Sequence, residues 1–313
     1  MKKNINISTD LFPKNIGLFI FSNGFEERWK KVLMNIESSN VNDFILIDRF
    51  GSLSSELVNY EGIDKDSLYL VDVLNENQVE QWNDVYNNVV SRIQSLKDSK
   101  AVIDITCIPQ LILYSIICQL HMLELNDKVL FAYTGASEYS IDSISSSDSS
   151  YNKISTVLGY PGISKPSCNE QHLILMVGFD FDLAKTLIRD LEPTSLSLGV
   201  GTSAYQGGFE DINTDYLNQI KSFASTQISM DKISTFEFSC SDYKDAKESI
   251  SQEIEVHNNK NVVLCSMNTK VSSIAAAMAS LENETVKVCH IEPMFRNISD
   301  YSKCSDVVST FCL

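Results

Sequence analysis

The sequence of 313 residues lacks the long apolar segments that membrane proteins and exported proteins carry. No apolar run approaches the eighteen or so residues that cross a bilayer. The start, MKKNINISTDLFPKN, has two lysines but no apolar stretch behind them of the kind found in signal peptides. We therefore expect a cytoplasmic protein that makes no contact with a membrane.

Paired cysteines and closely spaced histidines are also missing. The eight cysteines contain no CxxC pair, so we expect reduced thiols. The four histidines have neither HxxxH nor HxH spacing, and this predicts that there is no preformed zinc site. They are His121, His172, His257 and His290.

Basic residues are fewer than acidic ones, 25 against 41. The formal net charge is −16, and no stripe rich in Lys or Arg offsets it, which argues against duplex DNA or long RNA as a partner. The phosphate-binding patterns GxGxxG and GxxxxGK[ST] are absent from the strand-to-helix turns, so no nicotinamide, flavin or ATP cofactor is expected. A small anion held by backbone amides stays compatible with this composition.

What the sequence does contain is an internal repeat. The segment IGLFIFSNGFEERWKKVLMNI from Ile16 is echoed by HLILMVGFDFDLAKTLIRDL from His172. In the same order, AVIDITCIPQLILYSIICQL from Ala101 is echoed by NVVLCSMNTKVSSIAAAMASL from Asn261. Each segment reads as an apolar strand, a polar turn and a helix, so the repeat predicts two similar α/β halves about a pseudo-two-fold axis.

Apolar strands alternate with helical stretches along both halves, which predicts two tandem Rossmann-like, mainly parallel sheets. A serine-rich stretch between the halves places the boundary near Lys165, with domains at 1–165 and 166–313. We expect irregular structure at Tyr205 to Tyr216. The predicted strands are Ile16–Phe21, Phe44–Ile47, Leu68–Val73, Ala101–Ile105, Lys128–Tyr133, His172–Val177, Ser195–Val200, Lys232–Phe238, Asn261–Cys265 and Thr285–Ile291.

The candidate site residues follow the strands, because ligands bind open parallel sheets at the carboxyl ends of the strands, beside helix N-termini. For the turn Ser22 to Gly24 and for Asp104, a helix cap or a turn-stabilising hydrogen bond is the competing interpretation. The candidate ligand-binding residues are Ser22, Asn23, Gly24, Asp104, Thr106, Gly178, Asn268, Thr269 and Lys270. Lys270 is suggestive, because a cation at a helix N-terminus is otherwise mildly unfavourable.

At these turns the chain resembles the CRISPR-associated Rossmann fold (CARF) sensors. Those domains have a polar turn after the first strand and a later strand that ends in a DxT or NxTGGTK-like turn; IDITCIPQ is similar to the first form and SMNTK to the second. The resemblance implies that two such domains pair, here within one chain, and that a cyclic oligoadenylate or related nucleotide lies across both sets of turns.

Three hypotheses follow for function. The first is a sensor of a small nucleotide or cyclic oligonucleotide that acts with a protein partner in antiphage defence. The second is a nucleotide-processing hydrolase or glycosidase-type enzyme that uses Asp104, Glu26 or Glu292 as acid, base or nucleophile. The third is a scaffold with a degenerate pocket, in which the tail FRNISDYSKCSDVVSTFCL serves as a docking segment.

Overall fold

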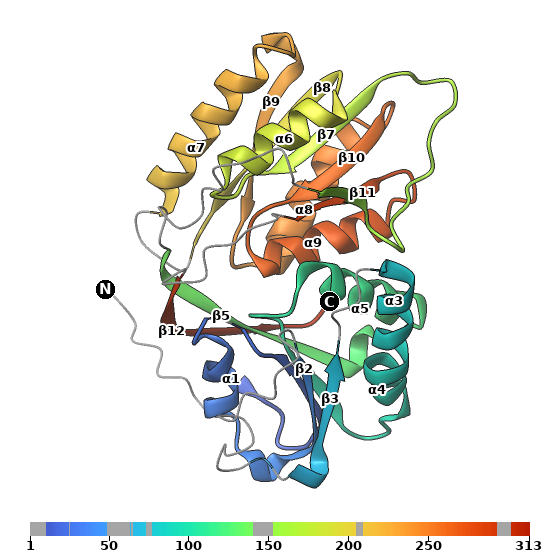
Figure 1. Ribbon diagram of the computed structural model, residues 1–313, viewed down its shortest axis with the longest axis vertical. Coiled ribbons are helices and arrows are strands. Elements are labelled where there is room, and N and C mark those ends of the chain that lie inside the picture. Colours follow the sequence, from blue (N-terminus) through green and yellow to red (C-terminus); the bar gives the residue numbers. More distant parts are fainter. Residues whose placement is uncertain are drawn as a thin grey trace. The chain divides into compact units, whose positions relative to one another are not determined.

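The computed structural model describes residues 11–24, 26–48, 63, 65–72, 77–139, 153–204, 209–292 and 302–313. The chain divides into two units, one formed by 1–139 with 302–313 and the other by 140–301. Within the described residues, each unit holds one six-stranded, mainly parallel sheet with helices against it (Figure 1). The predicted α/β class with two Rossmann-like sheets is confirmed.

The sheet of the first unit has the strand order β12-β5-β4-β1-β2-β3. Five of its strands are parallel, and β12 runs antiparallel to β5 at the edge. The strands are β1 (Ile16–Ser22), β2 (Val41–Asp48), β3 (Leu68–Asp72), β4 (Lys100–Asp104), β5 (Val129–Tyr139) and β12 (Ser302–Phe311). The sequence places continuous apolar runs in the central strands, and all seven residues of β1 are buried.

The helices of the first unit lie on both faces of this sheet (Figure 1). On one face is α1 (Trp29–Asn35); on the other are α5 (Gln110–Met122) and a continuous helical segment formed by α3 (Gln78–Val85), the π-helical turn Tyr86–Val90 and α4 (Ser91–Ser95). Nine residues of α5 are buried, which fits its almost uniformly apolar sequence. One core cluster includes Phe19, Phe21, Trp29, Val32, Val102, Ala132 and Val308.

The second unit repeats this arrangement strand for strand. Its order is β6-β11-β10-β7-β8-β9, again with one antiparallel edge strand, β6, paired with β11. The strands are β6 (Lys153–Thr156), β7 (Gln171–Met176), β8 (Ser195–Thr202), β9 (Ile233–Ser239), β10 (Asn261–Ser266) and β11 (Lys287–Glu292). The ten parallel strands of the two sheets are those that the sequence predicted, with ends that differ by at most three residues except in β5, which ends six residues later than predicted.

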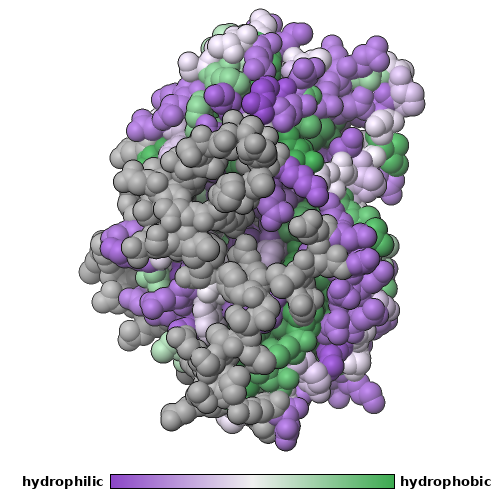
Figure 2. Space-filling view, viewed as in Figure 1, coloured by the Kyte–Doolittle hydropathy of each residue, from purple (hydrophilic) through white to green (hydrophobic). Residues whose placement is uncertain are grey.

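Two pairs of helices cover the second sheet, α6 (Phe181–Leu191) with α7 (Phe209–Ala224), and α8 (Tyr243–Val256) with α9 (Lys270–Leu281). Helix α6 is strongly amphipathic: Leu183, Leu187 and Ile188 are buried, while Arg189 and Asp190 are exposed. Figure 2 shows mainly hydrophilic side chains on the visible described surface of this unit. The irregular structure predicted at Tyr205 to Tyr216 is wrong for residues 209–216, which belong to helix α7. Residues 205–208 lie outside the described part of the chain.

The antiparallel edge strands are exchanged between the repeats. Strand β6 follows β5 in the chain but pairs with β11, whereas β12 follows β11 but pairs with β5. The first unit therefore takes its edge strand from the C-terminal segment, and the division of the chain falls at residue 139 rather than near Lys165. Strand β12 also lies in the tail that the scaffold hypothesis assigns to docking; residues 295–301 of that tail lie outside the described residues.

The exchange makes β12 necessary to the first sheet. Val308 is 7% exposed and belongs to the core cluster of that unit, whereas the adjacent Val307 is 45% exposed. We expect Val308→Asp to lower the free energy of unfolding by roughly 3 kcal/mol, because it buries an unpaired charge, and Val307→Asp to change it by less than about 0.5 kcal/mol. Hydrogen exchange should locate the Val308→Asp effect in β5; faster exchange confined to β11 would contradict the exchanged pairing.

Candidate functional site

The strand order of each unit reverses direction between two neighbouring central strands, and this is where ligands bind in such sheets. The reversal lies between β1 and β4 in the first unit and between β7 and β10 in the second. At both points a glycine of the repeat lies against the turn after the other strand. A Cβ on Gly24 would be 2.7 Å from Cys107 Sγ, and a Cβ on Gly178 would be 1.9 Å from the Met267 carbonyl oxygen. Packing alone therefore requires both predicted glycines.

The polar residues Ser22 and Asn23 are buried and tie the end of β1 to the end of β2. Ser22 Oγ donates a hydrogen bond to the Ile47 carbonyl oxygen at 2.9 Å. Asn23 Nδ2 donates to Asp48 Oδ1 at 2.8 Å. These bonds satisfy polar groups that burial removes from water, so here the turn-stabilising interpretation describes the two residues.

Asp104, the last residue of β4, is the most unusual group at this edge. It is 2% exposed, and its Oδ1 accepts hydrogen bonds from the Thr106 backbone N–H at 3.0 Å and from Thr106 Oγ1 at 2.5 Å. The Thr134 backbone N–H in turn donates to Thr106 Oγ1 at 3.0 Å. Among the described residues, Asp104 Oδ2 and Thr134 Oγ1 have no hydrogen-bond partner. Two buried oxygens of this cluster therefore lack the hydrogen bonds that buried polar atoms normally make.

A buried arginine supplies the charge beside this cluster. Arg28 is 4% exposed, and its Nη1 donates to the Thr134 carbonyl oxygen at 3.1 Å. Its Nε and Nη2 donate to Glu26 Oε2 at 2.8 and 2.5 Å, and Ser302 Oγ also donates to that carboxylate oxygen. Glu26, a candidate catalytic residue, is therefore held in an ion pair beside the edge strand.

Burial raises the pKa of Asp104 to about 7; the hydrogen bonds from Thr106 and the positive charge of Arg28 lower it, but by less. A carboxyl whose pKa lies near neutrality can exchange a proton with a bound molecule. Its position, at the carboxyl end of β4 and ahead of the N-terminus of α5, is where a ligand of this fold is expected.

In the second unit the corresponding polar residues mainly build the start of α9. Thr269 is its N-cap: Oγ1 accepts from the Ser272 backbone N–H at 3.3 Å and donates to the Cys240 carbonyl oxygen at 2.9 Å. Asn268 Nδ2 donates to the Val177 carbonyl oxygen at 2.6 Å, and its Oδ1 accepts from the Thr269 N–H at 2.8 Å. Lys270 follows as the first helical residue and is half-buried.

The candidate catalytic carboxylates belong to different units. Asp104 and Glu26 belong to the first unit, whereas Glu292 is an exposed residue at the end of β11 in the second. Thr134 and Ser302 lie in strands β5 and β12, outside the repeated strand-to-helix turns, so the sequence did not single them out. Arg28 lies in the turn after β1 that also carries Glu26.

The second unit also contains buried polar groups that the sequence did not single out. Asn213 on α7 donates from Nδ2 to the Gly201 carbonyl oxygen at 2.9 Å, and its Oδ1 has no partner within the described part of the chain. At the opposite end of the sheet, His172 and His257 are stacked, with ring centroids 3.5 Å apart. These two histidines are thus adjacent in space, although their spacing in sequence indicated no metal site.

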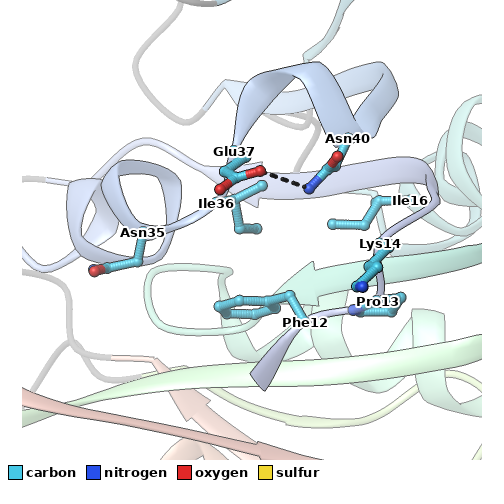
Figure 3. Close-up of a pocket in the computed structure, with 8 residues that line it drawn as sticks. All are labelled: Phe12, Pro13, Lys14, Ile16, Asn35, Ile36, Glu37 and Asn40. Atoms are coloured by element: carbon cyan, nitrogen blue, oxygen red, sulfur yellow. Dashed lines mark hydrogen bonds between the residues drawn. The ribbon is translucent and has the colours of Figure 1, made fainter. Parts of the chain in front are cut away.

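A pocket of about 200 Å³ lies at the other end of the first sheet, where β1 begins (Figure 3). Figure 3 shows the Phe12 ring on one side and the Glu37–Asn40 hydrogen bond, 3.2 Å long, on the other. Cofactor and drug-sized ligands generally occupy roughly 300–1,000 Å³. The pocket is therefore too small for a nucleotide, and it is remote from the strand ends that carry Asp104. Its lining residues are Phe12, Pro13, Lys14, Ile16, Asn35, Ile36, Glu37 and Asn40.

No family model and no curated protein matches this chain. Within the described ranges, none of the helices combines the length and the apolar character that crossing a bilayer demands. The geometry of the strand ends is therefore the main basis for assigning a function.

A Cβ added at each glycine would approach a different kind of atom, and this difference can be tested by substitution. At Gly178 the obstacle is a backbone carbonyl, so Gly178→Ala should lower the free energy of unfolding by about 3 kcal/mol. At Gly24 it is a thiol, so Gly24→Ala should cost about 2 kcal/mol, of which Cys107→Ala should recover about 1 kcal/mol in a double-mutant cycle. Denaturant unfolding measures both; additive effects at 24 and 107 would contradict the contact.

The raised pKa of Asp104 predicts a specific pH dependence of stability. Its contribution is fully present below the unfolded-state pKa of 3.8 and is lost as pH rises through about 7. The Asp104→Asn variant keeps an acceptor for Thr106 but does not titrate. The unfolding free energy of the wild type relative to this variant should therefore fall by roughly 4 kcal/mol between pH 4 and pH 8. Asp127→Asn, at an exposed position, should show little such trend.

Proposed function

We propose that this protein binds a small nucleotide-like ligand at the carboxyl-end turns of its Rossmann-like sheets. The observation that carries the proposal is the buried Asp104 carboxyl, whose Oδ2 has no hydrogen-bond partner in the described structure. A buried polar atom left unpaired costs about 1–3 kcal/mol, so a ligand that supplies the missing partner gains affinity from that site.

The chemistry around Asp104 supports a ligand with both hydrogen-bond donors and an anionic group. Asp104 Oδ2 accepts from an exocyclic amine, a ring N–H or a ribose hydroxyl when ionised. Thr134 Oγ1, which is also without a partner among the described residues, both donates and accepts. The first amides of α5 begin six residues after Asp104 and suit a phosphate group. A nucleotide combines these features in one small molecule.

The resemblance to CARF sensors supports a signalling role for this binding. It favours a cyclic oligoadenylate or a related nucleotide as the ligand, a cytoplasmic location and a function in antiphage defence. Because the described part of the chain shows no nuclease or protease site of its own, the signal passes to a protein partner in this proposal. The buried ion pair of Arg28 with Glu26, and the bond from Ser302 to Glu26, link the ligand-facing edge to β12.

One observation favours an enzyme as the second candidate. Asp104 has its pKa near neutrality, which is the property required of a general acid or base at physiological pH. In that case Asp104 would exchange a proton with the bound nucleotide or with an attacking water, and Glu26 would stay in its ion pair.

A thermal-shift screen with mononucleotides and with linear and cyclic oligoadenylates tests binding. A ligand that binds only the folded chain at a hundred times its dissociation constant should stabilise it by about 2.7 kcal/mol. Asp104→Asn should reduce this stabilisation, and the exposed Asp127→Asn should not. Lys270→Ala, with Lys244→Ala on α8 as its exposed control, tests the second unit separately.

The outcomes separate the hypotheses. If none of these ligands shifts the unfolding transition, the binding proposal fails. If the wild type returns the ligand chemically changed while Asp104→Asn binds it and leaves it intact, the enzyme replaces the sensor. Equal shifts in the wild type and Asp104→Asn would remove Asp104 from the site.

A further inference from the structure

The second unit holds a buried polar cluster at the amino ends of its strands, at the opposite end of the sheet from the turns discussed above. His172, the second residue of β7, is 0% exposed. Its two ring nitrogens lie against two serines of the neighbouring strand β8: Nδ1 is 2.8 Å from Ser195 Oγ, and Nε2 is 2.9 Å from Ser197 Oγ. Both serines are themselves buried.

Helix α8 contributes the other half of the cluster. Glu253 and His257 stand one helical turn apart at its C-terminal end, and His257 Nε2 is 3.2 Å from Glu253 Oε1. The His257 ring stacks on that of His172 at an interplanar angle of 20°. Ligand atoms of His172, Glu253 and His257 all lie within 4.8 Å of one another.

The hydroxyl of Ser197 has more polar neighbours than it can satisfy. Its Oγ is 2.5 Å from Glu253 Oε1, 2.8 Å from Ser234 Oγ, 2.9 Å from His172 Nε2 and 3.3 Å from His257 Nε2. A hydroxyl donates one hydrogen bond and accepts two, so one of four contacts is surplus. Two imidazole nitrogens and a carboxylate oxygen thus converge on one hydroxyl group. These three atoms carry lone pairs, and one cation can bind all of them, whereas the single hydroxyl hydrogen cannot.

We propose that His172, Glu253 and His257 bind one divalent first-row transition metal ion, with zinc as the reference ion. Two imidazole nitrogens and one carboxylate oxygen are a ligand set that zinc accepts. Ser197 Oγ, which lies within 3.3 Å of all three ligand atoms, would be the fourth ligand. The ion would join the end of α8 to the starts of β7 and β8.

The surroundings of the ligands fit this assignment. In the tautomer that carries its proton on Nδ1, His172 would donate to Ser195 Oγ and present Nε2 to the ion, which is how outer-sphere partners fix the tautomer of a metal-bound histidine. Lys260 lies one step further out: its Nζ donates to Ser195 Oγ at 2.9 Å and faces Glu170 Oε2 at 3.8 Å.

Coordination requires local adjustment of the ligand side chains. Metal–nitrogen and metal–oxygen bonds of about 2.0–2.2 Å set the ligand atoms roughly 3.3–3.6 Å apart, so the most distant pair has to approach. The stacked rings also have to turn until both Nε2 atoms face the ion. His172 is enclosed, but the side chains of His257 and Glu253 are 16% and 13% exposed, so these two residues have the freedom to adjust. We therefore expect the ion to break the stacking of the histidines.

Metal analysis of the purified full-length chain tests the site. After equilibration with zinc and dialysis, the wild type should retain one equivalent, and Glu253→Gln and His257→Gln should each reduce its affinity at least tenfold. Cobalt, added in place of zinc, should give the visible absorption of a tetrahedral site with nitrogen and oxygen ligands, without the near-ultraviolet thiolate band. Neither readout depends on the nucleotide proposal.

Two matched variants keep the result interpretable. His121→Gln removes a histidine of the first unit, and Cys312→Ser removes an exposed thiol; both should retain the full equivalent. Circular dichroism confirms that each variant folds. Binding of less than one equivalent by the folded wild type, or undiminished binding by His257→Gln, would overturn the proposal.

Discussion

Each unit is constrained by the close contact between two turns, which follow its first and fourth parallel strands along the chain. These strands are β1 and β4 in the first unit and β7 and β10 in the second. Gly24 lies against Cys107 in one sheet, and Gly178 lies against Met267 in the other. Because these turns follow neighbouring parallel strands, a Cβ at Gly24 would crowd the Cys107 side chain and a Cβ at Gly178 would overlap the Met267 carbonyl oxygen. The repeat keeps its glycines for this reason, while the polar residues around them are free to differ.

Those polar residues do differ, and the difference is largest at the end of the fourth strand. In the first unit Asp104 stands there as a buried carboxyl that binds Thr106. In the second unit Ser266 takes its place, and its hydroxyl lies 3.0 Å from Ser273 Oγ on α9. A hydroxyl satisfied by the next helix needs nothing from a ligand, whereas a buried carboxyl with one oxygen unpaired does. The two units thus share a backbone but not a binding chemistry.

The parallel strands could be predicted because buried central strands are continuous apolar runs. Strands β6 and β12 could not: KIST and SKCSDVVSTF mix polar and apolar residues, as one-sided edge strands do, and pairing with a strand distant in sequence selects their positions. At the site, Thr269 and Asn23 occupy the predicted turns but cap and brace them. Residue type alone does not separate a cap from a ligand contact, since both require the same hydroxyl or amide group.

Spacing rules fail for the histidine cluster for a geometrical reason. They detect ligands that share one element, such as Glu253 and His257 on α8, but His172 and its serines come from other strands. In a parallel sheet, residues at equal distances from the starts of neighbouring strands lie side by side at the same end of the sheet. His172, Ser195 and Ser234 are each the first or second residue of their strands, so position within the strand identifies them where spacing along the chain does not. The same reasoning that directs attention to the carboxyl ends of the strands therefore applies to their amino ends.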